Sequence, residues 1–187
     1  KMIYFFLWLS VLIVLVIPPV DKYLDANMSR HMLIQIPFLL VLGYLSGHRL
    51  RHKLISSNQR GLPGFIFFVG TMIFWMIPRS LDEAALSSLV DNMMHFNMLL
   101  AGFALGHSAS RLTFPLKGAL AIYGLSMIIS MGFAYSNYNS LICAAYNLEQ
   151  QRELGGYLLY LSPVLFIALI IWVGYHLTVK QRDKTAM

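Results

Sequence analysis

Two apolar stretches of this sequence carry residues that could bind a metal ion. In the first, His31 and Gln35 are four residues apart, and in the second Asp91 and His95 have the same spacing. Residues four apart lie on one face of an α-helix, so each pair predicts a polar spot on an otherwise apolar helix. Ionisable groups inside a membrane are costly, which makes such residues candidates for a functional site.

The residue types favour a transition metal, and copper before the others. Imidazole binds copper in either oxidation state, thioether favours the cuprous ion, and a carboxylate can bind the ion or orient an imidazole. We predict His31 and His95 as ligands, Asp91 as a ligand or orienting group, and Met94 as a soft auxiliary ligand. Zinc would need only histidine and aspartate. The alternative is a His95–Asp91 pair without an ion, with methionine as apolar filler.

Membrane helices must position these residues. Of the 187 residues, 58% are hydrophobic and 12% are charged, whereas soluble domains carry about 25% charged residues. The apolar runs are continuous, which predicts an all-α polytopic membrane helix bundle of about six transmembrane helices rather than a β-barrel. We expect a single transmembrane domain over residues 1–187, with spans at about 2–20, 29–48, 62–79, 89–107, 114–135 and 155–179.

The distribution of basic residues predicts the orientation of these spans. Most of the 14 Lys and Arg residues lie near the two termini and in the loops around residues 49–60 and 111–117. Positive residues stay on the cytoplasmic side, so both termini are expected there. The candidate metal site would then lie near the outer surface of a bacterial or archaeal plasma membrane. We expect the basic loops to contact membrane lipid rather than nucleic acid.

A short motif occurs twice, as "GYLSGH" at residues 43–48 and "GFALGH" at residues 102–107. Gly-x-x-x-Gly lets helix backbones approach closely, so we predict that these glycines serve helix packing. Each motif ends in a histidine, which leaves open an alternative cofactor. A small b-type cytochrome could hold one haem b between His48 and His107.

Three segments resemble the CtaG-type cytochrome oxidase assembly proteins. They are "HMLIQIPFLLVLGY" (His31–Tyr44), "MMHFNMLLAGFALG" (Met93–Gly106) and "LEQQRELGGYLLYL" (Leu148–Leu161), in the order of the family. The sequence departs from the family in two places. Gln35 stands near the position of a second histidine, and Arg152-Glu153 interrupt the element that begins the last span.

The resemblance implies a copper-handling membrane protein that helps to build the copper centre of a respiratory oxidase. Its partner would be a larger membrane respiratory complex, and Glu149 and Gln150 could help to close the metal site. No bond-making is required of such a protein, and motifs of common hydrolases are absent, so we do not expect an enzyme. The alternative from a different class is a cofactor-free accessory subunit of a larger membrane metalloenzyme, such as an oxidase or a monooxygenase.

Overall fold

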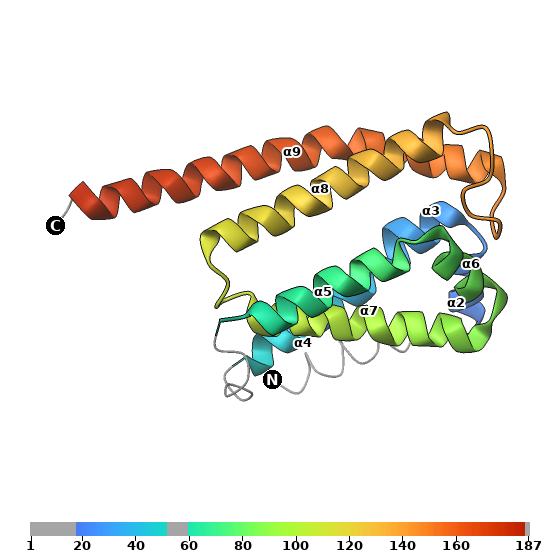
Figure 1. Cartoon of the computed structure of the whole chain (residues 1–187), viewed down its shortest axis with the longest axis horizontal. Helices are drawn as coiled ribbons and strands as arrows, with labels where there is room; N and C mark the ends of the chain where they lie inside the picture. Colours follow the sequence, from blue (N-terminus) through green and yellow to red (C-terminus); the bar gives the residue numbers. More distant parts are fainter. Residues whose placement is uncertain (1–17, 52–59, 186–187) are drawn as a thin grey trace. The chain divides into compact units, whose positions relative to one another are not determined.

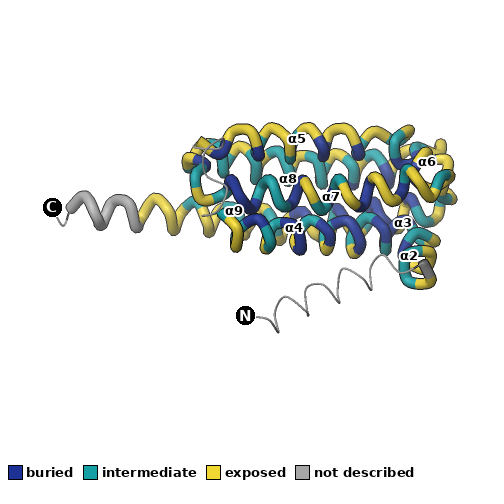
Figure 2. Tube along the Cα trace, turned by 90° about the horizontal axis from the view of Figure 1, so that it is seen from below, coloured by how far each residue is buried: buried dark blue, intermediate teal, exposed yellow. Residues whose placement is uncertain are grey.

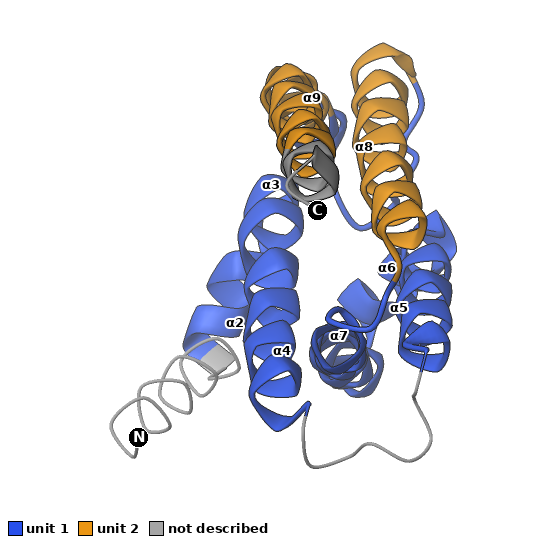
Figure 3. Ribbon diagram, turned by 90° about the vertical axis from the view of Figure 1, so that its left-hand side faces the viewer, with its two compact units in different colours: residues 1–112, 140–151 blue, residues 113–139, 152–187 orange. Residues whose placement is uncertain are grey.

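The computed structural model describes residues 18–51 and 60–185, and no strand occurs among these residues. The prediction of an all-α protein is therefore confirmed for the described part of the chain. The chain divides into two compact units, residues 1–112 with 140–151 and residues 113–139 with 152–187 (Figure 3). The single transmembrane domain stays a prediction.

Most of the helices belong to the first unit (Figure 1). They are α2 (Pro18–Asp25), α3 (Met28–Arg30), the π-helical turn η1 (His31–Gln35), α4 (Ile36–Leu50), α5 (Leu62–Trp75), α6 (Pro78–Leu86) and α7 (Ser88–Ser108). The second unit contains α8 (Phe114–Asn137) and most of α9 (Leu148–Thr185). The segments α3, η1 and α4 follow one another without a break, so Met28–Leu50 forms one helical span of 23 residues.

Three helical segments are long and apolar enough to cross a membrane, which indicates a membrane protein. They are Met28–Leu50, Phe114–Asn137 and Leu148–Thr178, and each overlaps a predicted span. The helix α7 is 21 residues long and covers the predicted span 89–107, but its polar side chains make it less apolar than these three. The predicted span 2–20 lies almost entirely outside the described residues. The total of six spans and the side of the termini stay predictions.

The predicted span 62–79 is bent rather than continuous. The helix α5 ends at Trp75, α6 begins at Pro78, and the two helices differ in direction by 74°. Proline has no N–H to donate and disfavours helical geometry in the residue before it, so the helix breaks at this point. The two segments make a fourth candidate span only when they are taken together.

The helices α4 and α7 lie side by side in the first unit (Figure 2). A Cβ atom added at Gly43 would lie 2.1 Å from the carbonyl oxygen of Leu99, and one at Gly47 would lie 2.0 Å from that of Phe103. No side chain fits at such distances, so the backbones are in direct contact. Successive turns of α4 meet successive turns of α7 in the same order, so the two helices are parallel.

The glycines of α7 make the reciprocal contacts with α4. A Cβ atom at Gly102 would lie 2.2 Å from the carbonyl oxygen of Leu40, and one at Gly106 would lie 2.0 Å from that of Tyr44. The prediction that the repeated glycines serve helix packing is therefore confirmed. Because the two motifs contact each other symmetrically, the pair of helices has a local pseudo-two-fold relation around these glycines.

Candidate metal centre

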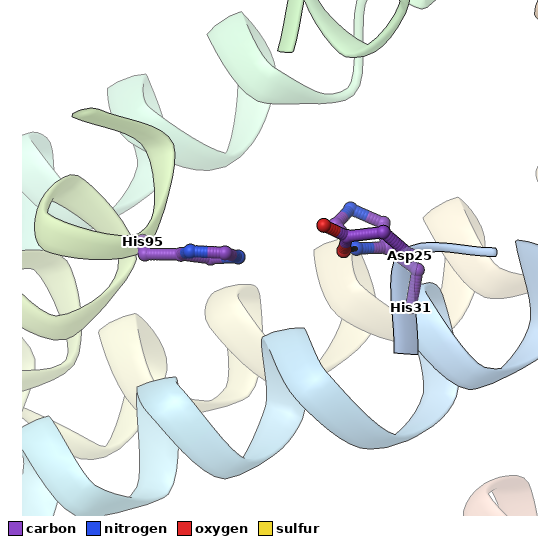
Figure 4. Close-up of side chains that lie close together, drawn as sticks. All are labelled: Asp25, His31 and His95. Atoms are coloured by element: carbon purple, nitrogen blue, oxygen red, sulfur yellow. Dashed lines mark hydrogen bonds and ion pairs between the residues drawn. The ribbon is translucent and has the colours of Figure 1, made fainter. Parts of the chain in front are cut away.

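Two buried imidazoles face each other where η1 and the first half of α7 meet. The ring centroids of His31 and His95 are 6.4 Å apart, and the two residues are only 4% and 3% exposed. Figure 4 shows the ring of His95 directed toward His31 and Asp25. Asp91, one turn before His95, places Oδ1 3.5 Å from His95 Nε2. The structure thus brings together three of the four predicted ligands.

Two carboxylates of α2, which the sequence analysis did not select, complete this cluster. Asp25 Oδ1 lies 2.8 Å from His31 Nδ1, and Asp21 Oδ1 lies 3.7 Å from His95 Nδ1. Burial raises the pKa of Asp21 above its ordinary value, and the neighbouring Asp25 adds to this effect. The sequence feature that could have identified these two carboxylates is the four-residue spacing of Asp21 and Asp25, which is the same as that of Asp91 and His95.

A capped turn brings α2 to the imidazoles. The side chain of Asn27 accepts hydrogen bonds from the backbone N–H groups of Ser29, at 2.9 Å, and Arg30, at 3.2 Å. Such an Asn cap satisfies N–H groups that have no partner at a helix start and lets the chain change direction there. Asp25 therefore lies next to His31, although α2 ends before α3 begins.

The wide turn η1 follows from the proline after it. Pro37 has no N–H, and its ring crowds the carbonyl group four residues earlier. The backbone adapts by a π-turn in which the N–H of Ile36 donates to the carbonyl oxygen of His31, five residues back. Such π-turns recur at functional sites. Here the turn lies at the point where His31 and Gln35 enter the cluster.

Gln35 connects the two imidazoles and is fully buried. Its Oε1 lies 2.9 Å from His31 Nδ1, and its Nε2 lies 2.8 Å from Asp21 Oδ1 and 3.0 Å from His95 Nε2. This assignment of the amide lets His31 Nδ1–H donate to Gln35 and Asp25, while His95 Nε2 accepts from the amide. Both rings are therefore held in a defined orientation.

The cluster has acceptors in excess and one nitrogen without a hydrogen bond. His95 Nδ1 is buried and lacks a hydrogen-bond partner. The ion pairs of the described residues are all between His and Asp, so no Lys or Arg among them neutralises the three carboxylates. Buried charges are normally paired or bound to metal. In the other tautomer of His95, Nε2–H would donate to the carboxamide oxygen of a flipped Gln35 and Nδ1 would have a free lone pair. A cation would then satisfy the carboxylates and His95 Nδ1 together.

Two overlapping sets of residues have the geometry to hold a metal ion. They are Asp25, His31 and His95, and Asp21, Asp91 and His95, and within each set the ligand atoms lie within 4.8 Å of one another. Imidazole nitrogen and carboxylate oxygen suit divalent transition ions such as copper or zinc. The residues present therefore fit a transition metal.

The loop before α9 covers part of this region of the first unit. Burial raises the pKa of the Tyr146 phenol, and the charges of Asp25 and Asp91 add to the effect, which places this side chain near the cluster. Gln150 Nε2 donates to the carbonyl oxygen of Ala26 at 3.4 Å, next to Asp25. Of the two residues predicted to help close the site, Gln150 thus lies beside it, whereas Glu149 is exposed.

Met94, the fourth predicted ligand, is fully buried in α7, as is Met98. Its position in the chain is next to His95. Its role as a soft ligand stays a prediction.

The histidines of the repeated motifs lie among other partners. The His48 ring stacks on Tyr44 with centroids 6.0 Å apart, and Arg51 Nη1 donates to His48 Nε2 at 2.6 Å. The His107 ring stacks on Phe103 with centroids 6.4 Å apart. Because α4 and α7 are in backbone contact just before both histidines, a porphyrin does not fit between them. This packing argues against the one-haem alternative.

The fold and the cluster together define a helical membrane protein with a buried imidazole–carboxylate centre. No protein-family model, curated protein or solved structure matches this chain.

Proposed function

We propose that this protein binds a copper ion at the cluster of Asp21, Asp25, His31, Asp91 and His95. The observation that carries the proposal is the meeting of two buried imidazoles with the buried Asp91 and the half-buried Asp21 and Asp25, without a Lys or Arg partner among the described residues. Copper in its cupric form is the divalent first-row ion that such nitrogen and oxygen donors bind most tightly.

The donor set favours the cupric over the cuprous ion. Cuprous copper prefers thiolate and thioether ligands, and the contacts within the cluster are made by imidazole, carboxylate and amide groups. Zinc also binds imidazole nitrogen and carboxylate oxygen, so it competes with copper for the same residues. Metal identity is therefore the first quantity to measure.

As a biological role we propose copper handling in the assembly of a respiratory copper oxidase, without catalysis by this chain. The resemblance of His31–Tyr44, Met93–Gly106 and Leu148–Leu161 to CtaG-type assembly proteins supports this role. The site would lie at the outer surface of a bacterial or archaeal plasma membrane, where copper and the oxidase subunit would meet.

The test is elemental analysis of the purified protein with a visible and EPR spectrum. We expect near-stoichiometric copper after loading, and its loss in the His31→Ala/His95→Ala double variant. The matched control is His48→Ala/His176→Ala, which removes two histidines outside the cluster. The proposal is wrong if the wild type retains no more copper than the His31→Ala/His95→Ala protein.

A metal-free accessory subunit is the second candidate, and the second unit supplies the observation in its favour. Only 11% of the apolar window in Phe114–Asn137 and 22% of that in Leu148–Thr178 is buried. Large side chains that are exposed on α9 include Val164, Phe166, Ile167, Ile170 and Ile171. Neighbouring subunits of a larger membrane complex could cover such a surface in place of lipid. Copurification only with a larger complex, without metal, would favour this candidate over the first.

A further inference from the structure

An apolar groove runs along α4 and α7, from Phe96 in α7, next to His95 in the chain, to the last turn of α4. It has a volume of about 440 Å³, and α7 contributes Phe96, Leu99, Leu100 and Phe103. Gly43 and Ser46 of α4 supply a floor of small residues. The Ser46 hydroxyl donates to the carbonyl oxygen of Leu42 in its own helix, so its hydrogen is not available to a ligand in the groove.

A single cationic side chain lies at the end of this groove. Arg49, in the last turn of α4, lines it together with Leu50. Arg49 is exposed, and no ion pair of the described residues includes it. From Gly43 to Leu50 the helix rises by about 10 Å. The groove is therefore apolar along about 10 Å of α4, with one positive charge where α4 ends.

We propose that this groove binds an anionic phospholipid, with the phosphate at Arg49 and part of one acyl chain along Leu99 and Leu100. The charge and the apolar lining match the two parts of such a lipid. The basic residues near Arg49 are the ones that the sequence places on the cytoplasmic side, where anionic lipids are concentrated. None of the residues that line the groove belongs to the metal cluster.

The first test is native mass spectrometry of the full chain with equimolar dioleoylphosphatidylglycerol and dioleoylphosphatidylcholine. We expect the wild type to bind more phosphatidylglycerol than phosphatidylcholine. In Arg49→Gln this preference should be lower by about five-fold, because one cation at an anionic surface contributes an effect of that size. Arg60→Gln, an exposed cation outside the groove, is the matched control and should keep the preference. Equal losses in the two variants, or no preference in the wild type, would overturn the proposal.

The second test identifies the occupant directly. A photo-crosslinking residue at Leu100, introduced into the full chain in native membranes, should give an adduct with the mass of a phospholipid. A Leu100→Trp variant, which fills the groove, should bind less of both lipids without a change in metal content. Cross-links to a peptide, either of this chain or of another protein, would overturn the lipid assignment.

Discussion

The helices α4 and α7 are held together in two different ways along their length. At the end where η1 meets α7, buried polar side chains stand between the helices, and Gln35 joins His31 to His95. Further along, the glycines bring the two backbones into contact. The comparison shows that the two ends of this helix pair have different roles. Glycine contacts fix the distance between the helices, and the polar end uses that fixed distance to place two imidazoles against each other.

Breaking the glycine contacts should have the largest effect. In Gly106→Ala the new Cβ would lie 2.0 Å from the Tyr44 carbonyl oxygen, so the helices must separate. Overpacking of this kind costs about 1–3 kcal/mol or more, and metal affinity should fall as the imidazoles move apart. Thermal unfolding in detergent and copper titration measure the two effects.

The matched control for this change is Gly124→Ala in α8. Its Cβ would meet no atom within 4 Å, and alanine has a better helix propensity by up to about 1 kcal/mol. We expect unchanged or slightly higher stability. If Gly106→Ala behaves like this control, the glycines do not set the distance between α4 and α7.

Removing the bridge at the polar end should have the next largest effect. Gln35→Leu keeps a side chain of similar size but leaves the ring of His95 and the carboxylate of Asp21 without their amide partner. Loss of a group that orients metal ligands typically lowers affinity by about 10- to 100-fold. Copper titration measures the change, with Gln150→Leu, at the exposed edge of the site, as the control. Equal affinity in wild type and Gln35→Leu would show that the amide does not orient the ligands.

The third change should separate stability from metal binding. Burial raises the pKa of Asp21 above 3.8, so the ionised carboxylate destabilises the folded metal-free protein at neutral pH. Asp21→Asn keeps the acceptor for Gln35 and removes this charge. We expect a higher unfolding temperature without metal at pH 7 but weaker copper binding.

The sign of the pH dependence follows from the raised pKa. The folded state holds the Asp21 proton to higher pH than the unfolded state, so this residue's contribution to stability falls as the pH rises from 3.8 through the folded pKa. The advantage of Asp21→Asn should therefore shrink as the pH is lowered toward 3.8. Glu149→Gln, which removes an exposed negative charge, should show no such trend. An advantage that stays constant with pH would contradict this explanation.

The sequence predicted the part of this arrangement that follows from helical spacing. Asp91 and His95 share a helix face, and the repeated glycines indicate close packing, so both features could be predicted locally. The contributions of Asp21 and Asp25 depend on the turn after α2, which Asn27 caps, and no spacing rule carries across such a turn. Pro37 predicted a disturbed helix, but the π-turn that adapts to it is one of several possible responses.

Met94 offers the smallest and most selective change. The hydrogen bonds and ion pairs of the cluster are made by nitrogen and oxygen, and Met94 is fully buried next to His95 in the chain. Met94→Leu nearly conserves the side-chain volume, so it should cost less than about 1.5 kcal/mol and leave cupric affinity unchanged within about two-fold. Met98→Leu, one turn further along α7, controls for packing. A selective loss of cuprous affinity in Met94→Leu would add the thioether to the site, because only the cuprous ion gains from that ligand. A loss of cupric affinity in Met94→Leu that Met98→Leu does not share would contradict the expectation that Met94 has no role in holding the cupric ion.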